Sequence, residues 1–159
     1  LNGERSSRVE RLADVFREAG IETEVSDNIR CALWQKLLLV GSWAGLGALS
    51  QSSLGVVCDQ SELRSLVDQA MDEGIAVGEA LGYPLPDNLK QQMWDFYHGV
   101  PHDTTASMMR DILAGRPSEL DAWNGAIVRF GNQMGVPTPV HQFTYDVLLP
   151  MERRARGQL

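Results

Sequence analysis

A long uncharged segment in the middle of the chain constrains its fold most strongly. Lys36 is followed by 22 residues without a charged side chain, ending at Cys58. This length would fit a membrane span, but glycines, serines and a glutamine make the segment too polar for one on transfer scales. We therefore expect a helix that is buried on most of its faces at the centre of a helical domain. Gly41 and Gly45 have the spacing that lets another helix approach closely.

The composition is typical of one compact soluble domain. The 159 residues, 43% of them hydrophobic, suffice for a core. A net charge of −7 without a basic run argues against nucleic acid as a partner. Cys31 and Cys58 lack the spacing of metal ligands, which indicates reduced cysteines and a cytoplasmic protein. The N-terminus carries neither a secretory signal nor a methionine, so we expect a piece of a longer protein.

One helix and one strand are expected before the uncharged segment. Residues 7–19 are amphipathic with helical spacing, and Gly20 is typical of a helix C-terminus. Residues 21–25 alternate apolar and acidic side chains with a period of two, which predicts a short strand. Ser26 or Asp27 can then cap the long helix, which should end or bend among the glycines and serines of residues 50–55.

The remainder of the chain is predicted to be all-α. We expect further helices over residues 59–81, 88–99, 104–114, 119–134 and from 139 onward. Ser118 with Asp121 resembles a capping box that opens the fourth of these helices. Thr138 followed by Pro139 is a strong start signal for the last one. The fold class is therefore all-α, with one helix–strand pair in front of it.

Lys36 stands at the head of the apolar segment without an acidic neighbour. On a helix the residues three and four positions away are Ala32, Leu33, Leu39 and Val40, so no local salt bridge explains it. The side chain can lie along apolar surface with its ammonium in water. Alternatively, it lies in a partly desolvated cleft, where a lowered pKa would make it a better proton donor near neutral pH. The spacing leaves both interpretations open.

Several motifs occur in an order that points to a known family. The segment AGIETEVSDNIRCALWQK is similar to a join between domains, in which a strand leads into a helix carrying W-x-K. The segment TASMMRDILAGRPSELDAWNGAIVRFGNQMGVPTP contains S-M-x-x-D, S-E-L-D with a following N-G, and G-V-P-T-P. In this order the motifs resemble the C-terminal part of the ketopantoate reductase (2-dehydropantoate 2-reductase) family.

The resemblance implies a two-domain NADPH-dependent reductase of 2-keto acids, acting in pantothenate biosynthesis. Residues 1–26 would be the last helix and strand of a missing N-terminal nucleotide-binding Rossmann domain. Residues 27–159 would form a substrate-binding and catalytic α domain like that of 6-phosphogluconate dehydrogenases. The chain has no G-x-G-x-x-G turn, so alone it should be inactive. Its expected partners are a small 2-keto acid, its own Rossmann domain and, as a further option, a second copy in a homodimer.

The resemblance also assigns site residues. Lys36 would be the general acid that protonates the keto oxygen. Glu119 would orient the substrate and the lysine, and Ser107 would bind the substrate. Without the family pattern, Glu119 reads as a favourable charge in the first turn of a helix, and Ser107 as an exposed helical serine. We expect Asp111 and Asn124 to serve the structure.

Two departures from the family pattern leave the substrate open. Val40 and Ala44 stand where ketopantoate reductases carry asparagines that contact the substrate, and such a loss of amide groups changes discrimination. The residues of this chain alone do not distinguish NADPH from NADH as the cofactor. A catalytically inactive helical interaction or dimerisation module is the alternative function. His98 and His102 have helical ligand spacing, but Pro101 interrupts them and no third ligand is evident, so we expect no metal site.

Overall fold

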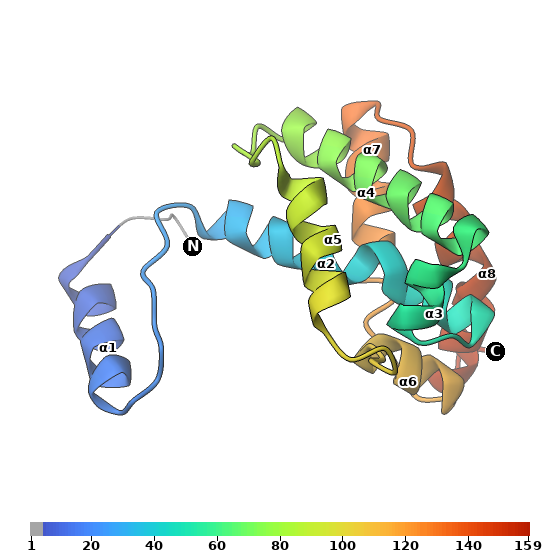
Figure 1. Ribbon diagram of the computed structural model, residues 1–159, viewed down its shortest axis with the longest axis horizontal. Helices are drawn as coiled ribbons and strands as arrows, with labels where there is room; N and C mark the ends of the chain where they lie inside the picture. Colours follow the sequence, from blue (N-terminus) through green and yellow to red (C-terminus); the bar gives the residue numbers. More distant parts are fainter. Residues whose placement is uncertain (1–4) are drawn as a thin grey trace.

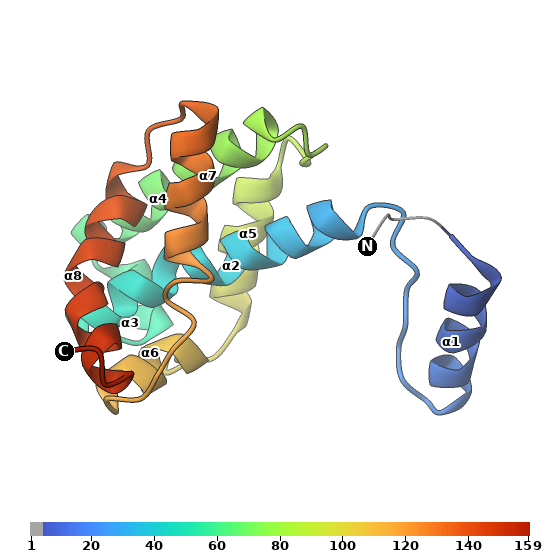
Figure 2. The same ribbon diagram turned by 180° about the vertical axis from the view of Figure 1, so that it is seen from behind.

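The computed structural model describes residues 5–159, and within this range it is all-helical, as predicted (Figure 1). The helices are α1 (Ser7–Glu18), α2 (Ile29–Ser50), α3 (Leu54–Asp59), α4 (Ser61–Ala80), α5 (Leu89–Gly99), α6 (Ser107–Leu113), α7 (Asn124–Met134) and α8 (Pro139–Ala155). Helices α2 to α8 pack into one body, whereas α1 and the segment after it stand apart in both views (Figures 1 and 2). The two parts are joined through the N-terminal end of α2.

Helix α2 runs through the middle of this body. All side chains from residue 41 to 48 are buried, and α2 packs against α4, α6, α7 and α8. The uncharged sequence explains this position, because burying the stretch removes no charged side chain from water. The prediction of a central buried helix is confirmed. Among the described residues, no helix combines the length and hydropathy that crossing a membrane requires.

The predicted close approach at the paired glycines is confirmed at Gly45. A Cβ atom on Gly45 would collide with the methyl group of Thr144 on α8 and lie 3.2 Å from Oδ1 of Asn124 on α7. At Gly41 the same atom would meet Ile127 and Trp123 at ordinary contact distances of 3.8 and 3.9 Å. Helices α7 and α8 therefore reach the backbone of α2 at Gly45 because that residue has no side chain.

The start of α2 differs from the expectation by a residue or two. Asn28 is the cap, and its Oδ1 accepts the backbone N–H of Cys31 at 3.0 Å. Ser26 instead accepts the backbone N–H of Asn28, and Asp27 pairs with Arg5 at 2.8 Å. Both predicted caps have other partners, so the helix begins at Ile29.

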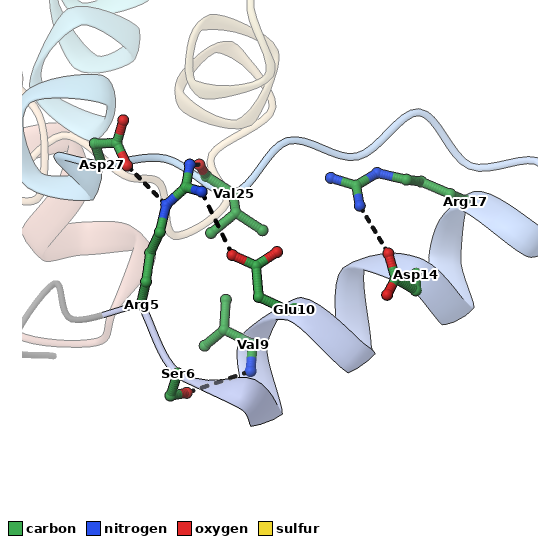
Figure 3. A network of polar contacts seen from close by, with 8 residues as sticks. All are labelled: Arg5, Ser6, Val9, Glu10, Asp14, Arg17, Val25 and Asp27. Carbon is green, nitrogen blue, oxygen red and sulfur yellow. Dashed lines mark hydrogen bonds and ion pairs between the residues drawn. The ribbon is translucent and has the colours of Figure 1, made fainter.

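The strand predicted over residues 21–25 is wrong for this chain: the segment has no regular structure. A strand needs a neighbouring strand for its backbone groups, and residues 5–159 provide none. The segment instead runs back beside α1 and is held by side chains (Figure 3). Arg17 donates to the carbonyl of Thr23 at 3.1 Å, and Arg5 donates to the carbonyl of Val25 at 3.2 Å. Ile21 stays 53% exposed.

The capping box expected at Ser118 is also absent. Residues 118–123 are not helical and end in turns over residues 120–123, and α7 begins only at Asn124. The side chain of Ser118 is engaged with Glu152 of α8, and Asp121 binds Arg129 and Tyr145. Contacts with a distant helix thus replace the local bonds that would have opened a helix here. Glu119 consequently lies in a turn, and the interpretation of its charge as one in a helix's first turn is wrong.

Helix α8 begins at Pro139, as predicted, but its cap comes from another helix. Thr138 forms no side-chain capping bond. The carboxylate of Glu73 on α4 accepts the backbone N–H groups of Val140 at 2.7 Å and His141 at 3.0 Å. Glu73 is only 9% exposed, and its burial raises its pKa against the opposing effect of these two bonds. The start of α8 is therefore attached directly to α4.

Candidate functional site

Lys36 projects from the N-terminal half of α2. Its side chain is exposed and, among the described residues, makes no hydrogen bond or ion pair. It borders a shallow pocket of about 380 Å³ between α2 and α5. The pocket is lined by Ala32, Gln35, Lys36, Leu39, Leu89, Gln92, Met93 and Phe96. An unpaired ammonium beside a mainly apolar wall is suited to meeting an anionic or carbonyl-bearing ligand.

The exposure of Lys36 bears on the two interpretations of its sequence setting. Lys36 is exposed in this chain, and the apolar side chains of Leu39 and Phe96 line the same pocket. Residues 5–159 therefore do not supply the desolvation that the second interpretation requires. Any such desolvation has to come from atoms that cover this face of α2.

Ser107 and Glu119 lie in contact. Ser107 is the first residue of α6, and Glu119 lies in the turns before α7. The hydroxyl of Ser107 donates to Oε2 of Glu119 at 3.4 Å, and both residues are exposed. The structure thus joins two residues that the sequence singled out twelve positions apart. Together they present a hydroxyl and a carboxylate to solvent from a single point.

The Ser107–Glu119 pair and Lys36 lie beside the same helix. Helix α6 packs on the C-terminal half of α2, where Sδ of Met109 is 3.5 Å from a Cβ placed on Gly47. The turn of Glu119 reaches the middle of α2 through Trp123, which packs near Gly41 and donates its N–H to the carbonyl of Glu119 at 2.9 Å.

Lys36 lies five residues before Gly41, about 7.5 Å closer to the N-terminal end of α2, since each helical residue rises about 1.5 Å. Within residues 5–159 no hydrogen bond or ion pair joins Lys36 to Ser107 or Glu119. The described residues therefore show no contact between Lys36 and the Ser107–Glu119 pair, and the meeting of all three side chains at one ligand stays a prediction.

The two positions that depart from the family pattern differ in accessibility. Val40 follows Lys36 by one helical turn and is half-buried, whereas Ala44 is completely buried. Val40 therefore offers an apolar surface next to Lys36. Ala44 contributes to the core and offers nothing to a ligand in this chain.

Asp111 and Asn124 hold the structure together, as expected. Asp111 pairs with Arg116 through two hydrogen bonds of 3.0 and 2.6 Å. Asn124 is buried, and its Nδ2 contacts the carbonyl of Gly41 at 3.4 Å and Nδ1 of His141 at 3.1 Å. The other nitrogen of His141, Nε2, lies 3.0 Å from the carbonyl of Ala70.

His141 is neutral in this setting. Burial lowers its pKa from 6.5 to about 4, although the bond to Ala70 opposes the change. Because a carbonyl can only accept, Nε2 carries the proton and Nδ1 accepts from Asn124. The imidazole thus joins α4, α7 and α8 within the core and lies outside the candidate site.

Sequence reasoning missed the residues that hold the Glu119 turn. Glu152 on α8 and Arg156, the residue directly after α8, enclose Ser118, and their spacing of four residues is the only local signal of a pair. They line a polar pocket of about 480 Å³ together with Asp121 and Tyr145. The hydrogen bond from Tyr145 and the bond from Arg129 lower the pKa of Asp121, so it is a carboxylate at neutral pH.

The described residues contain no group of three His, Cys, Asp or Glu side chains that could hold a metal ion. His98 stacks on Trp94, while His102 contacts Asp59 at 3.0 Å. Helical spacing does not bring the two histidines to a common ligand. Residues 5–159 also contain no strand followed by a glycine-rich turn, the arrangement that binds a dinucleotide.

Comparison with known proteins agrees with the resemblance in the sequence. A family model described as the ketopantoate reductase PanE/ApbA C terminal matches residues 28–152. A 2-dehydropantoate 2-reductase of Mesorhizobium japonicum is 35% identical over 153 residues, which cover 96% of this chain and 45% of the relative. The chain thus spans about half the length of the curated relatives that it matches.

Solved structures share the fold. A PanE/ApbA family ketopantoate reductase from Ralstonia eutropha superposes with a TM-score of 0.87 at 31% identity, covering 95% of this chain and 50% of that one. A D-mandelate dehydrogenase in complex with NADH and anilino(oxo)acetate superposes with a TM-score of 0.83 at 24% identity, over 94% of this chain and 49% of that one, and shows the fold alone. Because the family model covers most of its length, the chain belongs to the ketopantoate reductase family.

Proposed function

We propose that this chain is the substrate-binding half of an NADPH-dependent 2-keto acid reductase and that Lys36 is its proton donor. The observation that carries the proposal is the hydrogen bond between Ser107 and Glu119. It joins two residues of the family pattern at one point beside α2, the helix that bears the exposed and unpaired Lys36. In the parent protein, residues 1–26 would complete the nucleotide-binding domain, and residues 27–159 would form the α domain.

In this proposal the residues of this chain donate the proton and bind the substrate. The carbonyl carbon of the keto acid receives a hydride, and the carbonyl oxygen takes a proton from Nζ of Lys36. The product is a 2-hydroxy acid, and the neutral lysine regains its proton from water. Before the transfer, the ammonium also attracts the negative charge that develops on the oxygen. A nicotinamide cofactor bound by the N-terminal half would supply the hydride.

Ser107 and Glu119 would hold the far end of the substrate. A carboxylate accepts and a hydroxyl both donates and accepts, so the pair suits a hydroxyl group on the substrate. The apolar surface of Val40 favours a less polar substrate than a pair of asparagines would. A D-mandelate dehydrogenase that shares this fold was solved with NADH and anilino(oxo)acetate, so the fold alone selects neither the cofactor nor the acid.

The test is a kinetic assay of the full-length protein. Ketopantoate and a series of 2-keto acids with branched or aromatic side chains would be offered with NADPH and with NADH, and cofactor oxidation followed by absorbance. We expect reduction of at least one 2-keto acid, and a large loss of turnover in Lys36→Ala. Residues 1–159 alone should show no turnover.

The alternative of an inactive interaction module predicts a different outcome. The full-length protein would then reduce none of these acids with either cofactor. Lys36→Ala and Glu119→Ala would leave the rate of cofactor oxidation at the same background value. A reductase whose Lys36→Ala variant keeps its full turnover would disprove the role of the lysine while leaving the enzyme class intact.

A further inference from the structure

We propose that Glu152 and Arg156, near the C-terminal end of α8, are positioning residues for Glu119. They hold Ser118, the residue directly before Glu119, so that the Glu119 carboxylate stays beside Ser107. The inference rests on the proposed function, because it names what keeps one of the candidate site residues in place. Within residues 5–159 neither residue bonds to the side chain of Ser107 or Glu119, and both act through Ser118.

Glu152 binds Ser118 through both carboxylate oxygens. The backbone N–H of Ser118 lies 3.1 Å from Oε1 and 3.0 Å from Oε2, and the Ser118 hydroxyl donates to Oε2 at 2.6 Å. Arg156 donates from Nε to Oε1 of Glu152 at 2.6 Å and from a terminal nitrogen to the carbonyl of Ser118 at 2.9 Å. Glu152 is only 4% exposed, so water competes weakly for these bonds.

Every polar group of Ser118 is therefore in use. Its hydroxyl also accepts the backbone N–H of Leu120 at 3.2 Å, and the side chain of Leu120 is completely buried in the core. Residues on both sides of Glu119 are thus fixed. Glu119 itself remains exposed, and its carbonyl accepts the backbone N–H of Trp123 at 2.9 Å.

The turn needs such support because it has no helical hydrogen-bond ladder. Residues 115–123 form turns, a bend and irregular backbone between α6 and α7. A site carboxylate on such a segment is displaced easily, and a shift of about 1 Å can cost up to about a hundredfold in rate. Charge-assisted hydrogen bonds from a neighbouring helix restrict that motion more strongly than neutral ones do.

A matched control lies at the N-terminal end of α8, where Glu73 of α4 binds the backbone. Glu73 is buried, like Glu152, and also accepts two backbone N–H groups, those of Val140 and His141. Glu73→Gln and Glu152→Gln therefore remove the same charge from similar surroundings. Both should lower stability, but only Glu152 is linked to Glu119.

The experiment is a double-mutant cycle in the full-length reductase with its 2-keto acid. The variants are Glu152→Gln, Glu119→Ala and the double variant, with rates corrected for the folded fraction measured by circular dichroism. We expect Glu152→Gln to lower kcat/KM for the keto acid roughly ten- to hundredfold while the KM for NADPH stays unchanged. In the Glu119→Ala background the same change should have an effect of less than about twofold, because its target is gone.

Glu73→Gln should have the same small effect on kcat/KM in both backgrounds. If Glu152→Gln does not fold, Ser118→Ala replaces it, since this change removes the hydroxyl bonds to Glu152 and Leu120 and keeps the backbone N–H bonds. It should show the same dependence on Glu119 with a smaller amplitude.

Two results would overturn the inference, and they differ in what they leave standing. Equal losses from Glu152→Gln with and without Glu119 would make Glu152 a general stabilising residue and leave the proposed function intact. Wild-type kinetics in Glu119→Ala would remove Glu119 from the mechanism, and with it both its proposed role and this inference.

Discussion

The hydroxyl of Ser107 donates a hydrogen bond of 3.4 Å to the carboxylate of Glu119, and this contact joins the start of α6 to the turns before α7. The bond is long and exposed, so it is easily exchanged for bonds to a ligand. The two side chains are thus close enough to bind the same ligand group, and the bond between them is weak enough to be replaced by bonds to that group. Lys36, on α2, forms no hydrogen bond or ion pair within residues 5–159.

Replacement of Lys36 by alanine should affect chemistry and leave the fold unchanged. In the full-length enzyme, Lys36→Ala should lower kcat by roughly two to four orders of magnitude, the usual range for a general acid or base. The affinity for NADPH should not change, because the lysine acts on the keto acid. Stability should stay within about 0.5 kcal/mol, since the side chain is exposed and unpaired.

The other lysine of the chain is a suitable control. Lys90 binds Asp68 at 2.7 Å and Asp72 at 2.8 Å and does not line the Lys36 pocket, so Lys90→Ala removes a charge and two ion pairs outside that lining. Steady-state kinetics and chemical denaturation should show a small loss of stability with unchanged kcat. Equal turnover losses in the two variants would contradict the assignment of Lys36.

The stability of the domain should fall as the pH is lowered from about 6.5 to about 4. Burial lowers the pKa of His141 to about 4 in the folded protein. The unfolded chain binds a proton at this residue below its ordinary pKa of 6.5, while the folded protein does not, so acid favours unfolding across this window. The full effect is on the order of 3 kcal/mol, and it should level off below pH 4.

Urea titrations of the wild type and of His141→Gln at several pH values isolate this contribution. The difference between the two free energies of unfolding should shrink as the pH falls from about 6.5 to about 4. Glu73, whose pKa is raised by burial, acts in the opposite direction above its ordinary pKa, and the subtraction removes that effect because both proteins contain it. A difference that does not vary with pH would refute the neutral assignment of His141.

Glu73 should contribute more to the start of α8 than the local cap does. Glu73→Gln leaves a buried backbone N–H without its charged acceptor, which costs roughly 1–3 kcal/mol. Thr138→Val keeps the shape of the side chain and removes the hydroxyl, which forms no capping bond here. Thermal unfolding should therefore show a clear loss for Glu73→Gln and a smaller one for Thr138→Val. The reverse order would show that the hydroxyl caps the helix after all.

The two glycines of α2 should respond differently to alanine. At Gly45 the added methyl would collide with Thr144, so overpacking should destabilise the domain by roughly 1–3 kcal/mol. At Gly41 the methyl finds ordinary contacts with Ile127 and Trp123, and the gain in helix propensity is up to about 1 kcal/mol. Denaturation of both variants measures the difference, and a similar loss at Gly41 would show that its surroundings are tighter than these distances imply.

Elements with a local cause could be predicted. The amphipathic spacing of residues 7–19 produced α1, and the uncharged run after Lys36 produced the buried part of α2. Pro139 marked the start of α8. Each of these signals lies within a few residues of the structure that it specifies, so no knowledge of distant contacts was needed.

The errors share one cause, which is a partner distant in sequence or absent. Residues 21–25 have a strand pattern but no second strand to pair with in the described chain. Ser118 has the pattern of a helix cap, yet its groups bind Glu152, which lies 34 residues away. A local pattern states what a segment can form, and the available partners decide which option is realised.

The sequence by itself determined that the chain is all-α, that its uncharged helix lies at the centre, and that its motif order is that of ketopantoate reductases, because these are properties of consecutive residues. Only the tertiary structure decided that Ser107 and Glu119 meet. It also decided that Glu152 and Arg156 hold Ser118, at the start of the turn that precedes α7. Hydrogen bonds between residues so far apart depend on how the helices pack, and they leave no periodic trace in the sequence.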